Sequence, residues 1–148
     1  MVKLKNEHRF QEYIKKNEGL VKKLYYCSEG FPTIGYGHKC KPDEVKLYAK
    51  PISTVRARFI FKQDFAVAVG TAYKVFPHCI ESLSENRQMC IVDMAFNLGE
   101  TGLRKFKKMV KAVEEKNFDK ASDEIMDSKY AKQVKGRAKT NADYMRMG

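Results

Sequence analysis

The segment from Asn17 to His38, NEGLVKKLYYCSEGFPTIGYGH, constrains the fold of this chain more than any other segment. Apolar and aromatic runs at 24–26 and 31–36 lie on either side of the turn-forming sequence Ser28–Gly30, which predicts a β-hairpin. The glycines of the Gly-Tyr-Gly run that follows indicate bends or a close approach of the backbone to another group. A helical lobe alone would not explain this pattern, so we expect at least one small sheet.

Four side chains in this segment can take part in acid–base chemistry. An amphipathic pattern from about Asn6 predicts a helix that ends at Glu18, where the helix dipole disfavours an ionised carboxylate and should raise its pKa. Eight residues separate Glu18 from Cys27, five more precede Thr33, and His38 ends the run. A hairpin of this length can place Cys27 beside Thr33, opposite the acid. Such a site suits hydrolysis of a glycosidic bond.

The spacing of Glu18, Cys27 and Thr33, with the run from Thr33 to His38, resembles the motif of the phage lysozymes (endolysins). In that family a Glu is followed after eight residues by Asp or Cys, and after five more by Thr. The resemblance implies that these three residues are catalytic and that Glu29 contacts the substrate. It also implies an α+β, mainly α, lysozyme-like fold, in which a long helix joins a small N-terminal β-hairpin lobe to a helical lobe.

The chain length and composition fit a single domain over residues 1–148. At 17.1 kDa, with 43% hydrophobic and 32% charged residues, the chain can bury a core and is not expected to be disordered. We expect a hairpin lobe at about 18–52, and a helical lobe at about 75–148 that includes the N-terminal helix. The N-terminal residues contain no continuous apolar run, so neither a signal peptide nor a stable membrane anchor is expected.

The formal net charge of +11 admits several partners. Nucleic acid, anionic cell-wall polymers and lipid headgroups all attract a basic surface. Charge alone does not choose between them, and solvated basic faces remain the simplest interpretation of Lys22-Lys23 and of the cluster Arg104, Lys105, Lys107, Lys108 and Lys111.

The cysteines do not predict a metal site. Cys27, Cys40, Cys79 and Cys90 lack the spacing of a zinc ribbon, and the near-cluster of Cys27, His38 and Cys40 has no fourth ligand at a suitable spacing. Without an export signal, free thiols in a reducing cytoplasm are the expectation. We expect no cofactor and no metal.

The remainder of the chain predicts a polar loop followed by helices. The loop covers Lys39–Pro51 and holds at most a short strand, and the long helix runs from Ser53 or Thr54 to about Lys74. Ser82 and Glu85 have capping-box spacing before an apolar helix over Asn86–Leu98, for which Gly99 supplies the stop. Cys90 in this helix is expected to be a small buried hydrophobe. Further helices are predicted over Phe106–Glu115, Phe118–Met126 and Val134–Met145.

The resemblance implies supporting roles for five more residues. Asp64 is expected to pair with His38 and tie the two lobes together, against the alternative of an ordinary exposed helix Asp. Phe96 and Asn97, in the segment Asp93–Gly102, are candidates for substrate contact, although Phe96 could equally be a core residue. Arg137 follows a Tyr and a Gln as in the family and would orient Glu18; the alternative is a surface Arg in a basic tail.

The function that the resemblance implies is hydrolysis of the β-1,4 bond between N-acetylmuramic acid and N-acetylglucosamine in bacterial peptidoglycan, leading to host cell lysis. A monomer is expected to accumulate in the host cytoplasm and to reach the wall through a membrane opened by a partner such as a holin. Two alternatives stay open. One is a nucleic-acid-binding module, which charge alone suggests, and the other is a non-catalytic or tail-associated wall-binding protein of the same fold.

Overall fold

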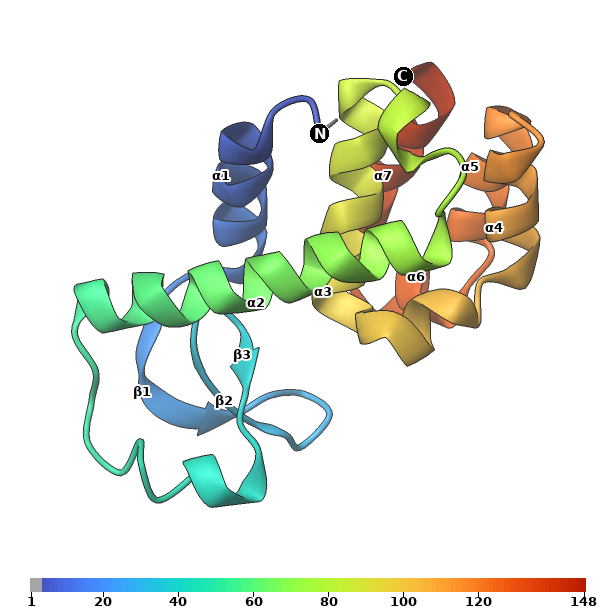
Figure 1. Ribbon diagram of the computed structural model, residues 1–148. Helices are drawn as coiled ribbons and strands as arrows, with labels where there is room; N and C mark the ends of the chain where they lie inside the picture. Colours follow the sequence, from blue (N-terminus) through green and yellow to red (C-terminus); the bar gives the residue numbers. More distant parts are fainter. Residues whose placement is uncertain (1–3) are drawn as a thin grey trace. The chain divides into compact units, whose positions relative to one another are not determined.

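The computed structural model describes residues 4–148 and confirms a mainly helical α+β fold with a small antiparallel sheet (Figure 1). The chain forms two compact units. The sheet unit comprises Gln11–Val67, and the helical unit comprises the described residues up to Phe10 together with Ala68–Gly148. Helices α1 (Glu7–Glu18) and α2 (Thr54–Val75) contribute residues to both units. Whether the units behave as one domain stays a prediction.

The sheet unit contains the predicted hairpin and a short third strand, which ends at Lys39, where the segment predicted to hold at most a short strand begins. Strands β1 (Val21–Tyr26), β2 (Pro32–Gly35) and β3 (His38–Lys39) pair antiparallel in that order. In the β1–β2 pair, Tyr25 lies opposite Thr33. Strand β3 is too short, at two residues, for an alternating pattern to be visible in the sequence.

The segment between β3 and α2 packs against a small hydrophobic core. Its 3₁₀ helix η1 (Pro42–Glu44) begins with a proline, whose fixed φ suits the first position of a helix. The rest of the segment is irregular, as predicted for this region. The buried side chains of this core are Ile34, Cys40, Tyr48 and Ile60. Leu24, Val45 and Ile52 are partly buried and pack against them.

Helix α2 has the predicted extent to within one residue at its end. The Ser53 hydroxyl caps it by accepting a hydrogen bond from the Arg56 N–H at 3.0 Å. Its inner face in the sheet unit buries Ala57, Phe61 and Phe65. Although α2 is 22 residues long, none of the helices within residues 4–148 is both long and apolar enough to cross a membrane.

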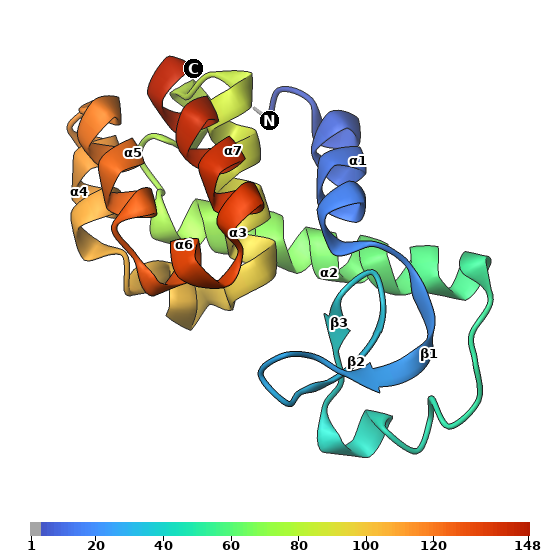
Figure 2. The same ribbon diagram turned by 180° about the vertical axis from the view of Figure 1, so that it is seen from behind.

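Besides its parts of α1 and α2, the helical unit contains the long helix α3 (Glu85–Arg104) and several shorter helices. They are η2 (Ile80–Ser82), α4 (Lys107–Glu114), α5 (Phe118–Met126), α6 (Lys129–Gln133) and α7 (Lys135–Met147). Helix α7 packs against α3, α5 and α6, and these contacts can be followed in Figure 2. The sequence predicted α4, α5 and α7 but missed α6, because five residues are too few to show helical periodicity.

Two details of α3 correct the sequence prediction. The helix is capped by Ser84, which accepts from the Arg87 N–H at 3.3 Å, and not by Ser82, whose hydroxyl instead donates to the Cys79 carbonyl in η2. Gly99, with φ of 72°, interrupts the helix as predicted, but helical structure resumes and continues to Arg104. Cys90 has no exposed surface, as expected for a core thiol.

Candidate active site

Glu18 is the last residue of α1, and the chain leaves the helix directly after it. Gly19 adopts a left-handed conformation with φ of 71°, and its N–H donates to the Lys15 carbonyl at 2.8 Å. Glycine takes this conformation without the steric cost of a Cβ, so it ends the helix at this point. Glu18 is thereby half-buried at the start of the sheet. The raised pKa predicted for it stays a prediction.

The turn between β2 and β3 brings the backbone against the Glu18 carboxylate. Gly37 has φ of 69°, and a Cβ added there would overlap the carboxyl group of Glu18. Any other residue would push that carboxylate away. The Gly-Tyr-Gly run therefore does what its pattern indicated, since it allows the close approach of the backbone to a functional side chain.

Cys27 and Thr33 come together across the turn of the β1–β2 hairpin. The Cys27 N–H donates to the Phe31 carbonyl at 2.9 Å, and the Gly30 N–H donates to the Cys27 carbonyl at 2.8 Å. Gly30, with φ of 86°, allows the chain to reverse. The buried Thr33 hydroxyl donates to the Phe31 carbonyl at 2.8 Å and lies within hydrogen-bonding reach of the Cys27 thiol.

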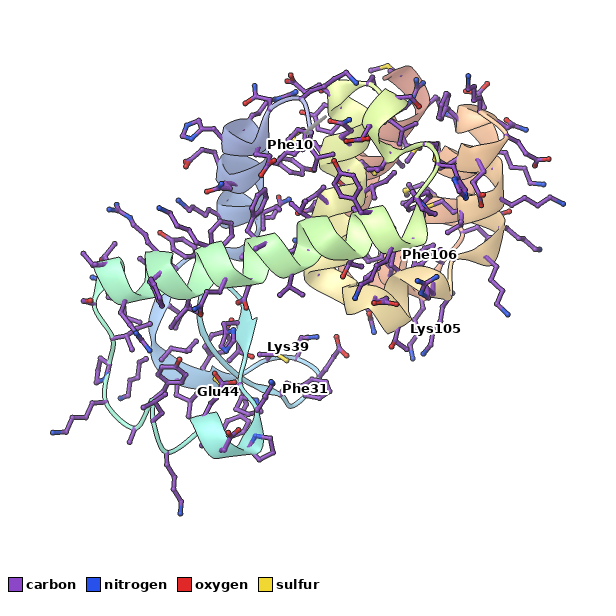
Figure 3. All side chains as sticks on the ribbon, in the orientation of Figure 1. Phe10, Phe31, Lys39, Glu44, Lys105 and Phe106 are labelled. Atoms are coloured by element: carbon purple, nitrogen blue, oxygen red, sulfur yellow. The ribbon has the colours of Figure 1, made fainter. Side chains whose placement is uncertain are left out.

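The pKa of the Cys27 thiol lies below its usual value. Desolvation pushes that pKa upward, but hydrogen bonding with the backbone at Phe31 and Glu29, the nearby Thr33 side chain and the charge of Lys39 outweigh it. Lys39 reaches this end of the hairpin because its ammonium lies 5.1 Å from the centre of the Phe31 ring, and both side chains are labelled in Figure 3. The thiolate, which is the form able to act as a base, therefore forms more readily at Cys27 than in an ordinary cysteine.

Tyr25 is a site residue that the sequence analysis missed. It lies opposite Thr33 and two positions before Cys27, so alternation puts the three side chains on one face of the hairpin. Desolvation and the negative charges of Glu18 and Cys27 raise the pKa of its hydroxyl. Tyr25 therefore lies in the electrostatic field of both groups. Its place two residues before Cys27 in a strand was the signal that could have identified it.

His38 lies between two carboxylates. Its Nδ1 is 2.7 Å from Asp64 Oδ2 and its Nε2 is 3.1 Å from Glu44 Oε2. The Asp64 hydrogen bond raises the pKa of His38 against desolvation, and the Asp64 charge and Glu44 add to that rise. The interpretation of Asp64 as an ordinary exposed residue is therefore wrong. Since both partners belong to the sheet unit, the pair fastens α2 to the sheet and does not link the two units.

Glu44 was not identified from the sequence. Its Oε1 accepts from the Lys41 N–H at 2.8 Å and its Oε2 faces His38. Desolvation would raise its pKa, but the hydrogen bonds from Lys41 and His38 and the His38 charge hold it below the usual value. Glu44 lies in a segment predicted as loop, where a single Glu carries no pattern that distinguishes it.

Arg137 is anchored in the helical unit by a buried carboxylate. Its Nε and Nη2 donate to the two oxygens of Asp93 at 2.9 and 2.8 Å. Asn141 Nδ2 donates to the same carboxylate at 2.8 Å and to the Tyr130 hydroxyl at 2.9 Å. With a side chain only 10% exposed, Arg137 is not a surface residue of a basic tail. Asp93 was signalled by its position, a lone acid in an apolar helix.

The structure brings together some of the predicted site residues and leaves others to be tested. Glu18, Cys27 and Thr33 lie in the sheet unit, with Glu29 exposed on the hairpin turn. The other three predicted residues, Phe96, Asn97 and Arg137, belong to the helical unit. Phe96 and Asn97 are half-buried there. The roles of these seven residues, including the orientation of Glu18 by Arg137, stay predictions.

Known proteins resemble this chain over most of its length. It is 30% identical over 148 residues to the pre-baseplate central spike protein Gp5 of Enterobacteria phage T4, covering 86% of this chain but 26% of the spike protein. It is also 28% and 26% identical over 149 residues to probable T4-type lysozymes 2 and 1 of Dictyostelium discoideum. These two matches cover 86% of this chain and 88% of each relative.

The family comparison covers the elements that carry the candidate site. The family model for phage lysozyme matches residues 15–141, from the last turn of α1 into α7. This range includes Glu18, the hairpin with Cys27 and Thr33, and the Asp93–Arg137 network. It accounts for well over half of the chain. The chain belongs to the phage lysozyme family.

Proposed function

We propose that the protein is a muramidase that hydrolyses the β-1,4 bond between N-acetylmuramic acid and N-acetylglucosamine in bacterial peptidoglycan. The observation that carries the proposal is the approach of the Gly37 backbone to the Glu18 carboxylate, in the same unit as the Cys27–Thr33 hairpin. Glycoside hydrolysis needs a group that protonates the leaving oxygen and a group that activates the attacking water, and Glu18 and Cys27 can supply these two roles. Family membership supports the same reaction.

In this proposal Glu18 acts as the general acid. Its carboxyl group protonates the glycosidic oxygen as the bond to the leaving sugar breaks, and positive charge develops on the other ring. The position at the C-terminal end of α1 supports this role, because the negative end of the helix dipole favours the protonated carboxyl. Gly37 leaves the carboxylate room to lie against the backbone, which limits the orientations that it can take.

Cys27 and Thr33 act on the water that completes the reaction. The Cys27 thiolate accepts a proton from this water, and the Thr33 hydroxyl orients it. The lowered pKa of Cys27 supports a base, because more of the thiol is ionised near neutral pH than in an ordinary cysteine. Tyr25 acts as a positioning residue on the hairpin face that carries Cys27 and Thr33, where the charges of Glu18 and Cys27 raise the pKa of its hydroxyl.

The test is clearing of permeabilised Gram-negative cell walls by the purified protein and by Glu18→Gln. We expect the substitution to reduce the clearing rate at least about a hundredfold, because it removes the proton donor and keeps the size of the side chain. Glu12→Gln, an equal charge change at an exposed position on α1, should clear at the wild-type rate. A folded wild type that does not clear walls would refute the enzyme, and equal clearing by Glu18→Gln would refute its role.

Substitutions of Cys27 distinguish a base from a residue that only occupies space. Cys27→Ser keeps the size but loses the thiolate, and should reduce the rate about a hundredfold or more. Cys27→Asp should remain active, with the acid limb of its pH–rate profile moved to lower pH, because a carboxyl group ionises at about pH 3.9 and a thiol at about 8.5. A fully active Cys27→Ser would contradict the assignment.

A second candidate is a wall-degrading part of a phage tail, favoured by the 30% identity to a central spike protein. The two candidates share the chemistry and differ in delivery. For the lytic candidate we propose accumulation in the host cytoplasm as a monomer and release through a partner such as a holin. Co-purification of the protein with phage particles would favour the tail, whereas its presence only in the soluble fraction of infected cells would favour lysis.

A further inference from the structure

Helix α2 carries large apolar side chains on the face turned away from the core. Val55, Phe59 and Val67 expose 73%, 53% and 69% of their surface. Intervals of four and eight residues put them on one side of the helix, while Ala57 and Phe61 on the opposite side are buried. Single exposed apolar residues are common, but three on one helix face form an apolar stripe, and such exposed patches are typical of binding surfaces.

Cations flank this stripe without carboxylates to neutralise them. Arg56, Arg58 and Lys62 are exposed, and within residues 4–148 none of them forms an ion pair. The Arg56 guanidinium lies 5.5 Å from the centre of the Phe59 ring. The only acid between Thr54 and Val67 is Asp64, which is held by His38. The exposed face is therefore both cationic and apolar.

The lysine-rich surface of α4 provides a contrast. Lys107, Lys108 and Lys111 are exposed there, but the large apolar side chains of α4, such as Met109, are buried. A purely cationic surface attracts any polyanion through long-range charge. An apolar stripe between cations gains only from a partner that offers anionic groups and hydrocarbon together. The two surfaces therefore differ in the partner that they suit.

We propose that the exposed face of α2, formed by Val55, Arg56, Arg58, Phe59, Lys62 and Val67, docks on the surface of an anionic lipid bilayer. A bilayer interface supplies both requirements, because phosphates accept hydrogen bonds from the cations and the acyl boundary takes up the apolar side chains. A glycan strand offers no continuous hydrocarbon surface for the two valines. The net charge of +11 adds attraction at longer range.

Co-sedimentation of the full chain with vesicles tests the proposal. The wild type should bind vesicles of equal parts phosphatidylglycerol and phosphatidylcholine at least about tenfold more tightly than pure phosphatidylcholine. Val55→Ser/Phe59→Ser/Val67→Ser should weaken this binding about tenfold or more. Arg56→Gln/Arg58→Gln/Lys62→Gln should weaken it by about fivefold for each cation removed. All six positions are exposed, so circular dichroism should show an intact fold.

The α4 variant Lys107→Gln/Lys108→Gln/Lys111→Gln is the matched control, because it removes the same charge from a surface without an apolar stripe. We expect a clearly smaller loss of binding than for the α2 charge variant. Equal losses, or wild-type binding by the serine variant, would overturn the proposal in favour of general charge attraction. If the serine variant bound vesicles normally but lost retention on lipid-free peptidoglycan, the partner would be the glycan.

Tryptophan fluorescence locates the contact on the helix. The chain contains no tryptophan, so Phe59→Trp introduces a single reporter on the proposed face. Its emission should shift to the blue with phosphatidylglycerol vesicles as the ring leaves water. Met126→Trp, at a position on α5 that is 42% exposed, should show no shift. Equal shifts from both reporters, or none from Phe59→Trp, would overturn the assignment of the docking face to α2.

Discussion

The two compact units hold their charged groups in different ways. In the helical unit, Asp93 has no exposed surface and receives hydrogen bonds from Arg137 and Asn141. In the sheet unit, His38 lies between Asp64 and Glu44, whose side chains are 27% and 23% exposed. The first cluster is sealed from solvent, whereas the second can exchange protons with it.

This difference separates a fixed structural element from one that responds to pH. A sealed carboxylate is stabilised only by its partners, and removal of one partner leaves an uncompensated buried charge. A partly exposed cluster such as that of His38 retains part of its hydration, so each of its interactions contributes less to the free energy of unfolding and depends on protonation. The Asp93 network therefore fixes α7 to α3, and the His38 cluster fastens α2 to the sheet over a limited pH range.

The largest expected effect is that of Asp93→Ala. It leaves the Arg137 guanidinium, which is only 10% exposed, without its carboxylate, and should lower the free energy of unfolding by about 3–5 kcal/mol. Urea unfolding measures this loss. Asp123→Ala is the control. It breaks a 2.5 Å ion pair between Asp123 and Arg146, in which the Asp123 side chain is 72% exposed. A loss no larger than that of the control would show that the network is not sealed.

His38→Asn should lower the free energy of unfolding by a smaller amount, about 1.5–3 kcal/mol near pH 5.5, because it removes two charge-assisted hydrogen bonds. The measurement is urea unfolding of both proteins at a series of pH values. His78→Asn, at an exposed histidine, is the control and should leave stability unchanged across the series.

The pH dependence of that difference has a defined sign. The raised pKa of His38 contributes stability that is fully present below its unfolded value of 6.5 and is lost as pH rises through the folded value. The lowered pKa of Glu44 contributes stability that is present above its unfolded value of 4.5 and is lost as pH falls through the folded value. The gap between the two proteins should be widest between pH 4.5 and 6.5, and a gap that does not vary with pH would contradict this account.

The elements that the sequence predicted well are those with strong local patterns. Helix α1 with its end at Glu18, helix α2 and helix α5 begin and end within a residue or so of their predicted positions, because periodicity, caps and glycines mark them. Strand β3 and helix α6 were missed because their two and five residues are too few to show a hydrophobic period.

The residues of the candidate site that lie within one continuous motif could be proposed from the sequence. Glu18, Cys27 and Thr33 follow from spacing within a single segment, and Gly37 from the need for a close backbone approach. Partners from other segments were less accessible, because no local pattern connects Glu44 to His38 or Asn141 to Asp93. Tyr25 lies outside the motif, and only the alternation of side chains along the predicted strand indicates that it shares a face with Cys27.

Gly37→Ala tests whether the sheet unit positions its acid by backbone geometry. A Cβ would overlap the Glu18 carboxylate, and a left-handed φ of 69° adds a cost of about 1–2 kcal/mol. We expect a modest loss of stability together with slower wall clearing, because the carboxylate must move. Gly136→Ala on α7, where a Cβ meets nothing within 4 Å, should keep full activity and gain stability. Normal clearing by Gly37→Ala would contradict the proposed positioning.

The smallest expected effects are those of substituting Tyr25 in the sheet unit and Tyr130 in the helical unit. Comparing the two substitutions tests the difference between the units. Tyr25 and Tyr130 each have a hydroxyl pKa raised by desolvation and by a nearby anion, but Tyr130 is 4% exposed and hydrogen-bonded to Asn141. Tyr130→Phe should lower the free energy of unfolding by about 0.5–1.5 kcal/mol and leave the pH–rate profile unchanged.

Tyr25→Phe should do the reverse. Its loss of a hydroxyl beside Glu18 and Cys27 should leave urea unfolding close to wild type, because the ring remains packed on the hairpin. The dipole of a neutral hydroxyl near a thiolate favours the anion, so we expect its removal to raise the pKa of Cys27 and to move the acid limb of the clearing rate to higher pH. A profile identical to wild type would mean that Tyr25 only fills space, and that the catalytic groups are set by Gly37 and Thr33 alone.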